Sequence, residues 1–117
     1  MSGSTSYHAG LAAEDQVADF YRRSGCDVTH RRWRGQGGEI DLVARDGDNV
    51  VFVEVKKSRD FARAAESLSL RQMKRIWAAA SEFLAGEPRG QLTPSRFDVA
   101  LVDAQGRIDV IENAFAA

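Results

Sequence analysis

Two carboxylates and a lysine occupy positions from which they could act together on a charged substrate. Asp41 precedes a strong hairpin signal, Asp-Gly-Asp-Asn at 46–49, and Glu54 and Lys56 follow it in a stretch rich in β-branched residues. A two-residue turn centred on 47–48 sets Asp41 directly opposite Glu54. Residues opposed in a hairpin point to the same face of the sheet, with Cβ atoms roughly 5 Å apart.

A pair of opposed carboxylates repels unless a shared proton, a lysine or a cation offsets the charge. Lys56 is two residues from Glu54 and therefore shares its face. A divalent cation would offset the repulsion more strongly, and oxygen ligands without histidine or cysteine favour Mg²⁺ or Mn²⁺ over Zn²⁺. The alternative is a solvated strand face, on which alternating charges are common.

The same register divides the hairpin into one apolar face and one mixed face. The apolar face comprises Ile40, Leu42, Ala44, Val51, Val53 and Val55. The other face carries Glu39, Asp41, Glu54 and Lys56 together with Val43 and Phe52.

A third carboxylate, Glu14, interrupts the apolar side of a predicted helix over 10–23. The apolar residues of that stretch recur at helical spacing, and Glu14 falls inside their arc. A carboxylate that faces a core is costly unless it is partnered. Glu14 is therefore either a site residue or a residue at the edge of the helix face.

The remaining elements place these residues in one α/β layered domain. The 117 residues suffice for a single domain over 1–117, of which we expect about the first nine to be flexible. The predicted order is αβββαββ, with a central mixed β-sheet flanked by helices. Helices are expected over 10–23 and 70–85, and strands over 27–34, 39–45, 50–56, 97–103 and 108–111.

The second predicted helix combines a start signal with basic residues in its first turns. Ser69 and Gln72 form a capping-box pattern, so Gln72 is either a capping partner or a site residue. Arg71, Lys74 and Arg75 stand where the helix dipole disfavours cations. They are candidates for phosphate contact, and ordinary exposed helix residues are the equal alternative.

Charge is unevenly distributed, although the formal net charge is −1. Residues 22–34 carry a net charge of +4 and residues 56–75 carry +5, while the rest of the chain carries −10. Such basic segments can steer phosphates, and charged loops that merely face water are the alternative. The single cysteine favours a reducing compartment, so we expect the cytoplasm. No apolar run approaches the roughly 20 residues of a membrane span, so no membrane partner is expected.

Two stretches resemble the core of the PD-(D/E)XK, or restriction-endonuclease-like, nuclease superfamily: GEIDLVA at 38–44 and VFVEVK at 51–56. More closely, the chain resembles the small YraN-like family of bacterial proteins, which is related to Holliday-junction resolvases. Shorter matches to that family are GxxAE at 10–14, RFDV at 96–99 and NAF at 113–115. The resemblance covers nearly the whole chain and implies a restriction-endonuclease-like core.

The resemblance also implies Mg²⁺-dependent hydrolysis of phosphodiester bonds in DNA, with branched or flapped DNA as candidate substrates. It makes Asp41 and Glu54 metal ligands and places Glu14 beside the metal. It assigns to Lys56 the orientation or activation of the attacking water. Resolvase-like nucleases often act as homodimers, so a homodimer is a further expectation. The basic candidates for nucleic-acid contact are Arg32, Arg34, Lys57, Arg71, Lys74 and Arg75, with Gln72 as a further site candidate.

Two other functions fit parts of the pattern. A nucleic-acid-binding module with a nuclease-like fold and an inactive site would retain the basic segments without cleaving DNA. A retaining glycosidase also uses two carboxylates about 5 Å apart. A sugar cleft, however, needs more aromatic walls than this small chain offers.

Overall fold

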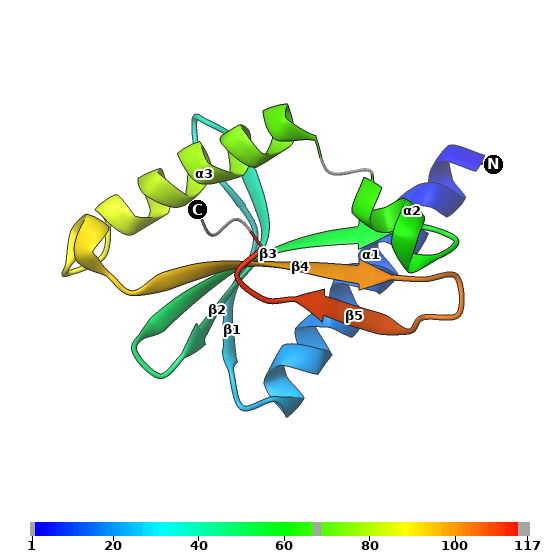
Figure 1. The fold of residues 1–117 in the computed structure, drawn as a ribbon, viewed down its shortest axis with the longest axis horizontal. Coiled ribbons are helices and arrows are strands. Elements are labelled where there is room, and N and C mark those ends of the chain that lie inside the picture. Colours follow the sequence, from blue (N-terminus) through cyan, green and yellow to red (C-terminus); the bar gives the residue numbers. More distant parts are fainter. Residues whose placement is uncertain (1, 67–68, 115–117) are drawn as a thin grey trace.

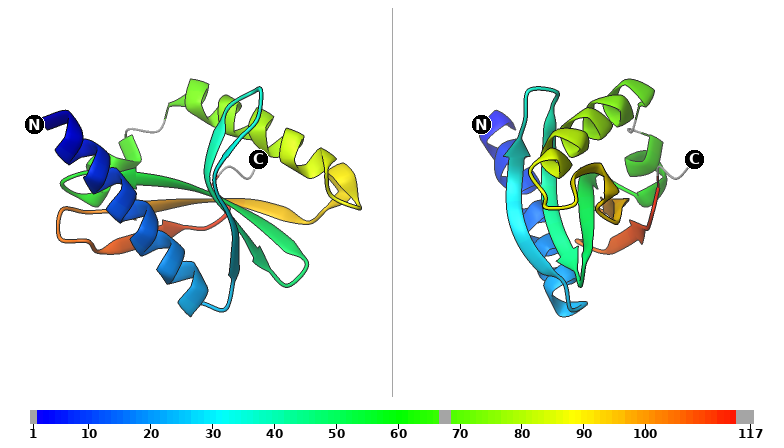
Figure 2. Two further views of the ribbon diagram at one scale, coloured as in Figure 1. Left: turned by 180° about the vertical axis from the view of Figure 1, so that it is seen from behind. Right: turned by 90° about the vertical axis from the view of Figure 1, so that its left-hand side faces the viewer.

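The computed structural model describes residues 2–66 and 69–114 and has a five-stranded sheet with helices on both faces (Figure 1). The helices are α1 (Ser2–Arg23), α2 (Phe61–Glu66) and α3 (Leu70–Ala85), with a short 3₁₀ helix η1 (Gly90–Leu92). The strands are β1 (Asp27–Arg34), β2 (Glu39–Asp46), β3 (Asn49–Lys57), β4 (Ser95–Val102) and β5 (Ile108–Ile111). Figure 2 shows α1 across one face of the sheet and α3 across the other. The chain is therefore an α/β protein, as predicted.

The sheet is mixed and has the strand order β1-β2-β3-β4-β5. Neighbouring strands run antiparallel except β3 and β4, which are parallel. A parallel pair needs a crossover connection, and the segment that contains α2 and α3 supplies it. The prediction of a mixed sheet flanked by helices is confirmed.

The β2–β3 hairpin has the register that the sequence predicts. Leu42 pairs with Val53 in this hairpin. Gly47 takes a φ of 61°, in the left-handed region that such a turn requires. The pairing ends at Leu42 and Val53, and Asp41 and Glu54 are the next residues outward along the two strands.

Two apolar layers hold α1 and α3 on the sheet, and burial of each larger side chain contributes roughly 1.5–3 kcal/mol. The layer under α1 contains Ala13, Val17, Ala18, Tyr21, Cys26, Leu42, Ala44, Val51, Val53, Ala100 and Val102. The layer under α3 contains Ile40, Val43, Val50, Phe52, Ala79, Ala80, Phe83 and Leu84.

Ile40 lies in the layer under α3, whereas the alternation predicts it on the other face with Leu42 and Ala44. The paired residues of β2 and β3 begin only at Leu42. The first residues of β2 pair with β1 instead. The start of β2 therefore leaves β3 and follows β1 toward α3, which turns Ile40 into the α3 layer.

The helix ends follow local signals. Gly25 adopts a φ of 93° and lets the Cys26 N–H reach the Tyr21 carbonyl at 3.0 Å, which ends α1 as predicted. The Ser69 hydroxyl accepts from the Gln72 N–H at 3.1 Å and caps α3.

The structure corrects the prediction at two helices. α1 begins at Ser2 rather than near residue 10, because the prediction depended on an apolar stripe that starts at residue 11, and no proline interrupts the earlier residues. The predicted order lacks α2, so the observed order is αβββααββ. Six residues are too few to show a helical period, but Asp60 marks the start of α2: its Oδ1 accepts from the Arg63 N–H at 2.8 Å.

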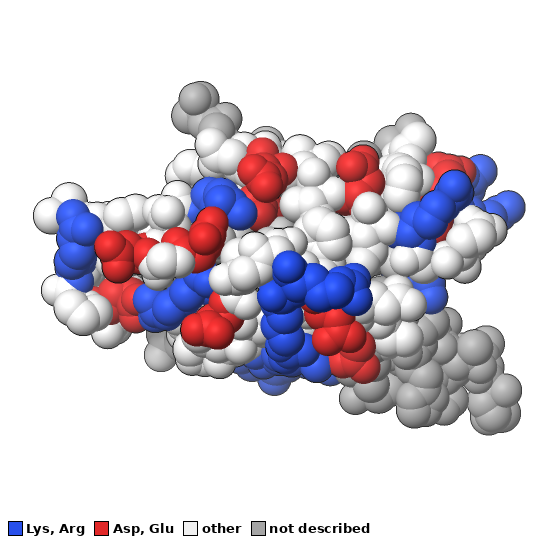
Figure 3. Space-filling view, turned by 90° about the horizontal axis from the view of Figure 1, so that it is seen from below, with Lys and Arg blue, Asp and Glu red and all other residues white. Residues whose placement is uncertain are grey.

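The surface seen in Figure 3 carries basic and acidic side chains next to one another rather than an expanse of one sign. Exposed ion pairs in the described chain include Arg22 with Asp19 at 3.1 Å. Exposed pairs of this kind contribute little to stability. In the part of the chain that the structure describes, no helix combines the length and apolar character needed to cross a bilayer.

Candidate active site

Asp41 of β2 and Glu54 of β3 bring their carboxyl groups together on the face that α3 covers. The two carboxyl groups lie close enough for each to shift the pKa of the other. The Val55 N–H donates to Asp41 Oδ2 at 2.8 Å and fixes that carboxyl where the β2–β3 ladder opens. Glu54 is only 8% exposed. The structure thus brings together the two carboxylates whose opposition the register predicts.

Both carboxyl groups hold a proton more strongly than free carboxyls do. Burial raises the pKa of Asp41 to about 6, against the Val55 hydrogen bond and with help from the charge of nearby Glu14. Burial also raises the pKa of Glu54 to about 8, and the charge of Asp41 adds to this rise while Lys56 opposes it. The pair therefore lacks enough positive charge to ionise fully near neutral pH.

Two polar side chains fix the orientation of Glu54. Lys56 Nζ lies 3.6 Å from Glu54 Oε1, and the lysine side chain is only 17% exposed. Gln72 of α3 donates from Nε2 to the same oxygen at 3.1 Å. Since Ser69 caps the Gln72 N–H, the backbone of Gln72 belongs to the cap and its side chain to the site.

Glu14 is buried, but its carboxylate is bound by an arginine. Arg32 Nε donates to Glu14 Oε1 at 3.1 Å and to Oε2 at 3.2 Å, and Arg32 Nη2 donates to Oε2 at 3.2 Å. Bidentate pairs of this kind are among the stronger charged hydrogen bonds. The charge of Glu14 still raises the pKa of Asp41, although the Glu14 carboxylate is bound to Arg32.

Arg32 reaches Glu14 through an unusual backbone conformation. Its φ is 52°, in the left-handed region, which costs a non-glycine residue of order 1–3 kcal/mol. Arg31 also contacts α1, with Nη2 at 2.6 Å from Asp15 Oδ1, whereas Trp33 packs in the layer under α3. Two successive side chains on one face break the alternation of a regular strand. The strained φ therefore turns Arg32 toward α1.

A cleft of about 440 Å³ opens beside the carboxyl pair. Asp41 and Glu54 line it together with Gln72 of α3. Arg34 and Arg75 contribute positive charge to its walls. The cleft is large enough for a phosphate group and its surrounding water. Acidic and basic side chains both line it.

The loop 35–38 between β1 and β2 forms one wall of this cleft, and Glu82 of α3 holds it in place. The Glu82 carboxylate accepts from the N–H groups of Gln36, at 2.7 Å, and of Gly37. A Cβ atom at Gly37 would lie 2.8 Å from the Ala78 Cβ, so the loop packs too closely for any larger residue. The sequence analysis identifies neither this loop nor Glu82 as part of the site; three glycines in four residues were the available signal.

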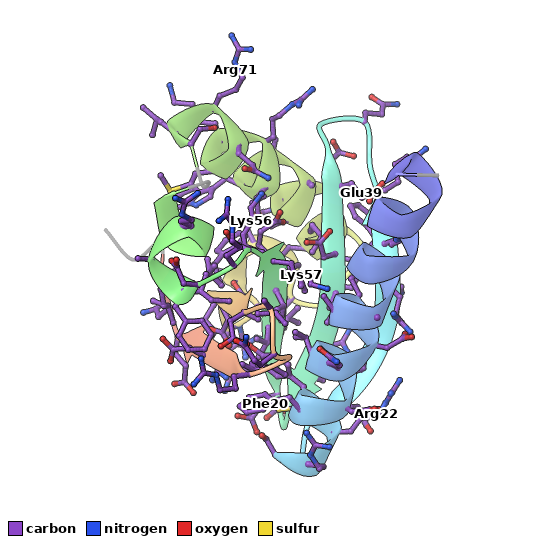
Figure 4. The ribbon with its side chains drawn as sticks, turned by 90° about the vertical axis from the view of Figure 1, so that its right-hand side faces the viewer. Phe20, Arg22, Glu39, Lys56, Lys57 and Arg71 are labelled. Atoms are coloured by element: carbon purple, nitrogen blue, oxygen red, sulfur yellow. The ribbon has the colours of Figure 1, made fainter. Side chains whose placement is uncertain are left out.

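A second groove of about 470 Å³ adjoins the cleft along α3. Gly37 and Arg75 border both hollows, and Arg71 and Lys74 line the second. Figure 4 shows Arg71 projecting from the end of α3 away from the sheet. Three of the predicted basic residues therefore lie beside the cleft that holds the carboxyl pair.

The other basic candidates lie in different surroundings. Lys57 is on the opposite side of β3 from Lys56, as strand alternation requires (Figure 4). Arg34 lines the cleft and also pairs with Glu39 at 2.9 Å. Arg32 is bound to Glu14.

The donor set of the cleft suits a hard divalent cation. Asp41 and Glu54 offer only oxygen, and the raised pKa of each carboxyl marks a place where added positive charge is favourable. Within residues 2–66 and 69–114, no three histidine, cysteine, aspartate or glutamate side chains are arranged to hold a metal ion. The two carboxylates fit such a cation, and Glu14 would complete the set only after leaving Arg32.

A further buried carboxylate, Asp98 of β4, has a structural environment. The Tyr21 hydroxyl donates to Asp98 Oδ2 at 2.7 Å, and Arg96 Nε donates to both carboxylate oxygens at 3.1 and 3.3 Å. The Asn113 N–H donates to Asp98 Oδ1 at 3.0 Å. Burial and the bond to Asp98 raise the pKa of Tyr21 well above its usual value. These contacts tie α1 to β4 and to the segment after β5.

Comparison with known proteins assigns the chain to a family. A family model described as "Uncharacterised protein family UPF0102" matches residues 13–102. The chain belongs to the UPF0102 family. A UPF0102 protein of Cereibacter sphaeroides strain KD131 is 69% identical over 117 residues, which is the full length of both chains. UPF0102 proteins of Ruegeria pomeroyi (66% identical, 97% of this chain and 92% of the relative) and Roseobacter denitrificans (54% identical, 98% and 89%) are also similar.

The UPF0102 match includes the parts of the chain that build the site. It extends from α1 to the end of β4 and so contains Glu14, Asp41, Glu54, Lys56 and Gln72. The relation to a UPF0102 family, expected from the YraN-like resemblance, is thereby confirmed.

Proposed function

We propose that this UPF0102 protein is a metal-dependent endonuclease that hydrolyses phosphodiester bonds in DNA on a restriction-endonuclease-like core. The observation that carries the proposal is the buried Asp41–Glu54 pair, with Lys56 beside it and a cleft in front of it. Branched or flapped DNA is the substrate class that the resemblance to resolvases favours. A homodimer would supply a second site for the second strand.

Mg²⁺ or Mn²⁺ is the proposed cofactor. When bound, such a cation supplies Lewis acidity at the phosphate and lowers the pKa of water. Asp41 and Glu54 would hold it through their carboxylate oxygens, with both groups ionised. The hydrogen bond from Gln72 holds Glu54 in position.

Lys56 is the proposed catalytic cation of the chain itself. Its ammonium group lies at the edge of the carboxyl pair, 3.6 Å from Glu54. From this position it orients the attacking water and stabilises the negative charge that develops on the phosphate oxygens.

The groove along α3 is the proposed path for the DNA backbone. Arg71, Lys74 and Arg75 line it, and it adjoins the cleft at Arg75. Lysine and arginine contacts to phosphate give affinity without sequence information and release counterions. We therefore expect DNA binding that weakens strongly with salt, and a shallower salt slope after Arg71→Gln.

The test is cleavage of linear, branched and flapped DNA with Mg²⁺ or Mn²⁺. We expect Asp41→Asn and Lys56→Ala each to reduce the rate about a hundredfold or more. Asp48→Asn, at the exposed β2–β3 turn, is the matched control and should retain the wild-type rate. Cleavage that persists unchanged in the Asp41 and Lys56 variants would overturn the proposal.

The second candidate function is a DNA-binding module without activity. The bidentate Arg32–Glu14 pair favours it, because this pair keeps Glu14 from the other two carboxylates. It predicts salt-sensitive DNA affinity that survives Glu54→Ala, with no cleavage of any substrate under either cation.

A further inference from the structure

Trp77 of α3 holds an aromatic ring at the surface of the protein, where it is 50% exposed. Of the phenylalanine, tyrosine and tryptophan side chains in the described part of the chain, it is the only exposed one. One exposed apolar side chain is ordinary in a folded protein, so only its surroundings can point to a ligand.

Two further rings support the inner face of the Trp77 indole. Trp77 stacks on Phe97 of β4, with ring centroids 5.9 Å apart and an angle of 4° between the ring planes. Phe97 in turn stacks on the fully buried Phe52, with centroids 5.2 Å apart. A parallel stack covers one face of the indole and leaves the other face to solvent, in agreement with the half exposure of Trp77. The outer face is therefore held in place before a ligand binds, which lowers the entropy cost of binding.

Trp77 also continues the basic row of α3 that lines the second groove. Arg71, Lys74 and Trp77 follow one another at intervals of three residues. Side chains three residues apart are neighbours on a helix surface, with Cβ atoms about 5–6 Å apart. Arg71 and Lys74 line the groove of about 470 Å³, and α3 carries no acidic residue between Leu70 and Ser81. Trp77 thus adds a ring face to a positively charged surface.

A cation beside an open ring face matches the two parts of a nucleotide. Proteins that bind single strands combine basic side chains on the phosphates with aromatic side chains on which bases stack. One sugar joins the base to its phosphate, so a nucleotide whose phosphate meets Lys74 carries its base toward Trp77. The bases of a duplex already stack on one another, and only an unpaired base can offer its face to the ring.

Charge favours DNA over a second copy of the chain as the occupant of this surface. A twofold contact uses the same patch on both copies. It would therefore bring two sets of Arg71 and Lys74 to one interface, where like charges repel. A DNA strand brings the opposite charge.

We propose that Trp77 binds an unpaired DNA base by stacking while Lys74 binds a phosphate of the same strand. This inference rests on the proposed function and specifies its substrate as DNA with an unpaired stretch along α3. The groove adjoins the cleft at Arg75, so the unpaired stretch leads from Trp77 toward the carboxyl pair.

The experiment uses the fluorescence of Trp77. The chain has two tryptophans, so Trp33→Phe leaves Trp77 as the single emitter. This variant is titrated at low salt with a short oligothymidylate and with a duplex, in the presence of EDTA to prevent cleavage. The single strand should quench Trp77 emission to saturation, and the duplex should bind with little quenching.

Variants of Trp77 in the otherwise unchanged protein test the stack by the anisotropy of labelled DNA. Trp77→Leu should lower the affinity for oligothymidylate about tenfold, as expected for the loss of one base–aromatic stack, and leave duplex affinity unchanged. Trp77→Phe keeps a ring and should retain most of the affinity, so the test does not depend on the folding of the leucine variant alone. Leu92→Ala is the control: Leu92 is 80% exposed, lies outside the lining of the groove, and its loss should leave both affinities unchanged.

The outcomes separate this inference from the proposed function. If the single strand binds without quenching Trp77, or if folded Trp77→Leu binds both DNA forms equally weakly, Trp77 only covers Phe97 and the inference is wrong, while the proposed function stands. Trp77 emission that changes with protein concentration alone would assign the surface to a second copy and would also overturn the inference. If neither DNA form binds, both fail.

Discussion

Gln72 of α3 donates a hydrogen bond to Glu54 of β3 at 3.1 Å. This hydrogen bond connects α3 to Glu54, a carboxyl whose pKa the charges of Asp41 and Lys56 shift in opposite directions. The same residue is fixed at its backbone by the Ser69 cap, so the start of α3 and the orientation of Glu54 depend on one another.

Replacement of Gln72 by alanine should weaken cation binding more than it weakens the fold. Loss of one hydrogen bond costs about 1 kcal/mol of unfolding free energy. Loss of a residue that orients a ligand costs about tenfold or more in metal affinity. Mn²⁺ titration and urea unfolding measure the two effects.

Gln91→Ala is the control for this change. The Gln91 side chain donates to the Ser81 carbonyl at 3.0 Å, at an exposed position away from the cleft. It should lose a similar amount of stability and no Mn²⁺ affinity. Equal Mn²⁺ affinities for the two variants would show that Gln72 does not orient Glu54 for cation binding.

The stability of the metal-free protein should depend on pH through Asp41 and Glu54. Both folded-state pKa values are raised, to about 6 and about 8, so the folded protein binds more protons than the unfolded chain above about pH 4. The contribution of the two groups is therefore fully present below about pH 4 and is lost as the pH rises through about 6 and about 8.

The difference in melting temperature between the wild type and the Asp41→Asn, Glu54→Gln double variant measures this contribution. The double variant should gain stability on the wild type as the pH rises from about 4 through about 6 and about 8. Mg²⁺ should stabilise the wild type most at that end, because both carboxyls are then ionised. A difference that stays constant with pH would contradict the account.

Gly37 should tolerate no side chain. A Cβ at this position would meet the Ala78 Cβ at 2.8 Å, so Gly37→Ala should push loop 35–38 off α3 and cost about 1–3 kcal/mol. The cleft loses its wall, and DNA affinity should fall. At Gly86 a Cβ would meet only the Phe83 carbonyl oxygen, at an ordinary 3.5 Å, so Gly86→Ala serves as the control and should leave DNA affinity unchanged.

Tyr21→Phe should affect stability and leave the site unchanged. The change removes the donor to the buried Asp98 carboxylate, which costs about 1–2 kcal/mol. Because Asp98 faces α1 rather than the cleft, Mn²⁺ affinity of the folded variant should equal that of the wild type. A loss of Mn²⁺ affinity would place Asp98 in the functional site.

The strand register was predictable because a two-residue turn leaves little freedom. Once Gly47 marks the turn, counting outward gives the register, and the observed pairs agree with it from Asp46–Asn49 to Leu42–Val53. The helix at 70–85 was predictable for a similar reason: Ser69 marks its start, and apolar residues recur along it.

Other features depend on contacts between distant segments, which spacing does not reveal. The Arg32–Glu14 pair joins β1 to α1 and requires a left-handed residue that nothing in the local sequence demands. The bond from Glu82 to loop 35–38 links residues 46 positions apart. Ile40 changes layers because β2 separates from β3, which is a property of the sheet rather than of the strand.

The most direct test of the central claim is a crystal structure of the protein with Mn²⁺, with the ion located by its anomalous scattering. The account predicts one Mn²⁺ ligated by oxygens of both Asp41 and Glu54, with Lys56 at its edge. Mn²⁺ bound elsewhere, or no Mn²⁺ at Asp41 and Glu54, would contradict it.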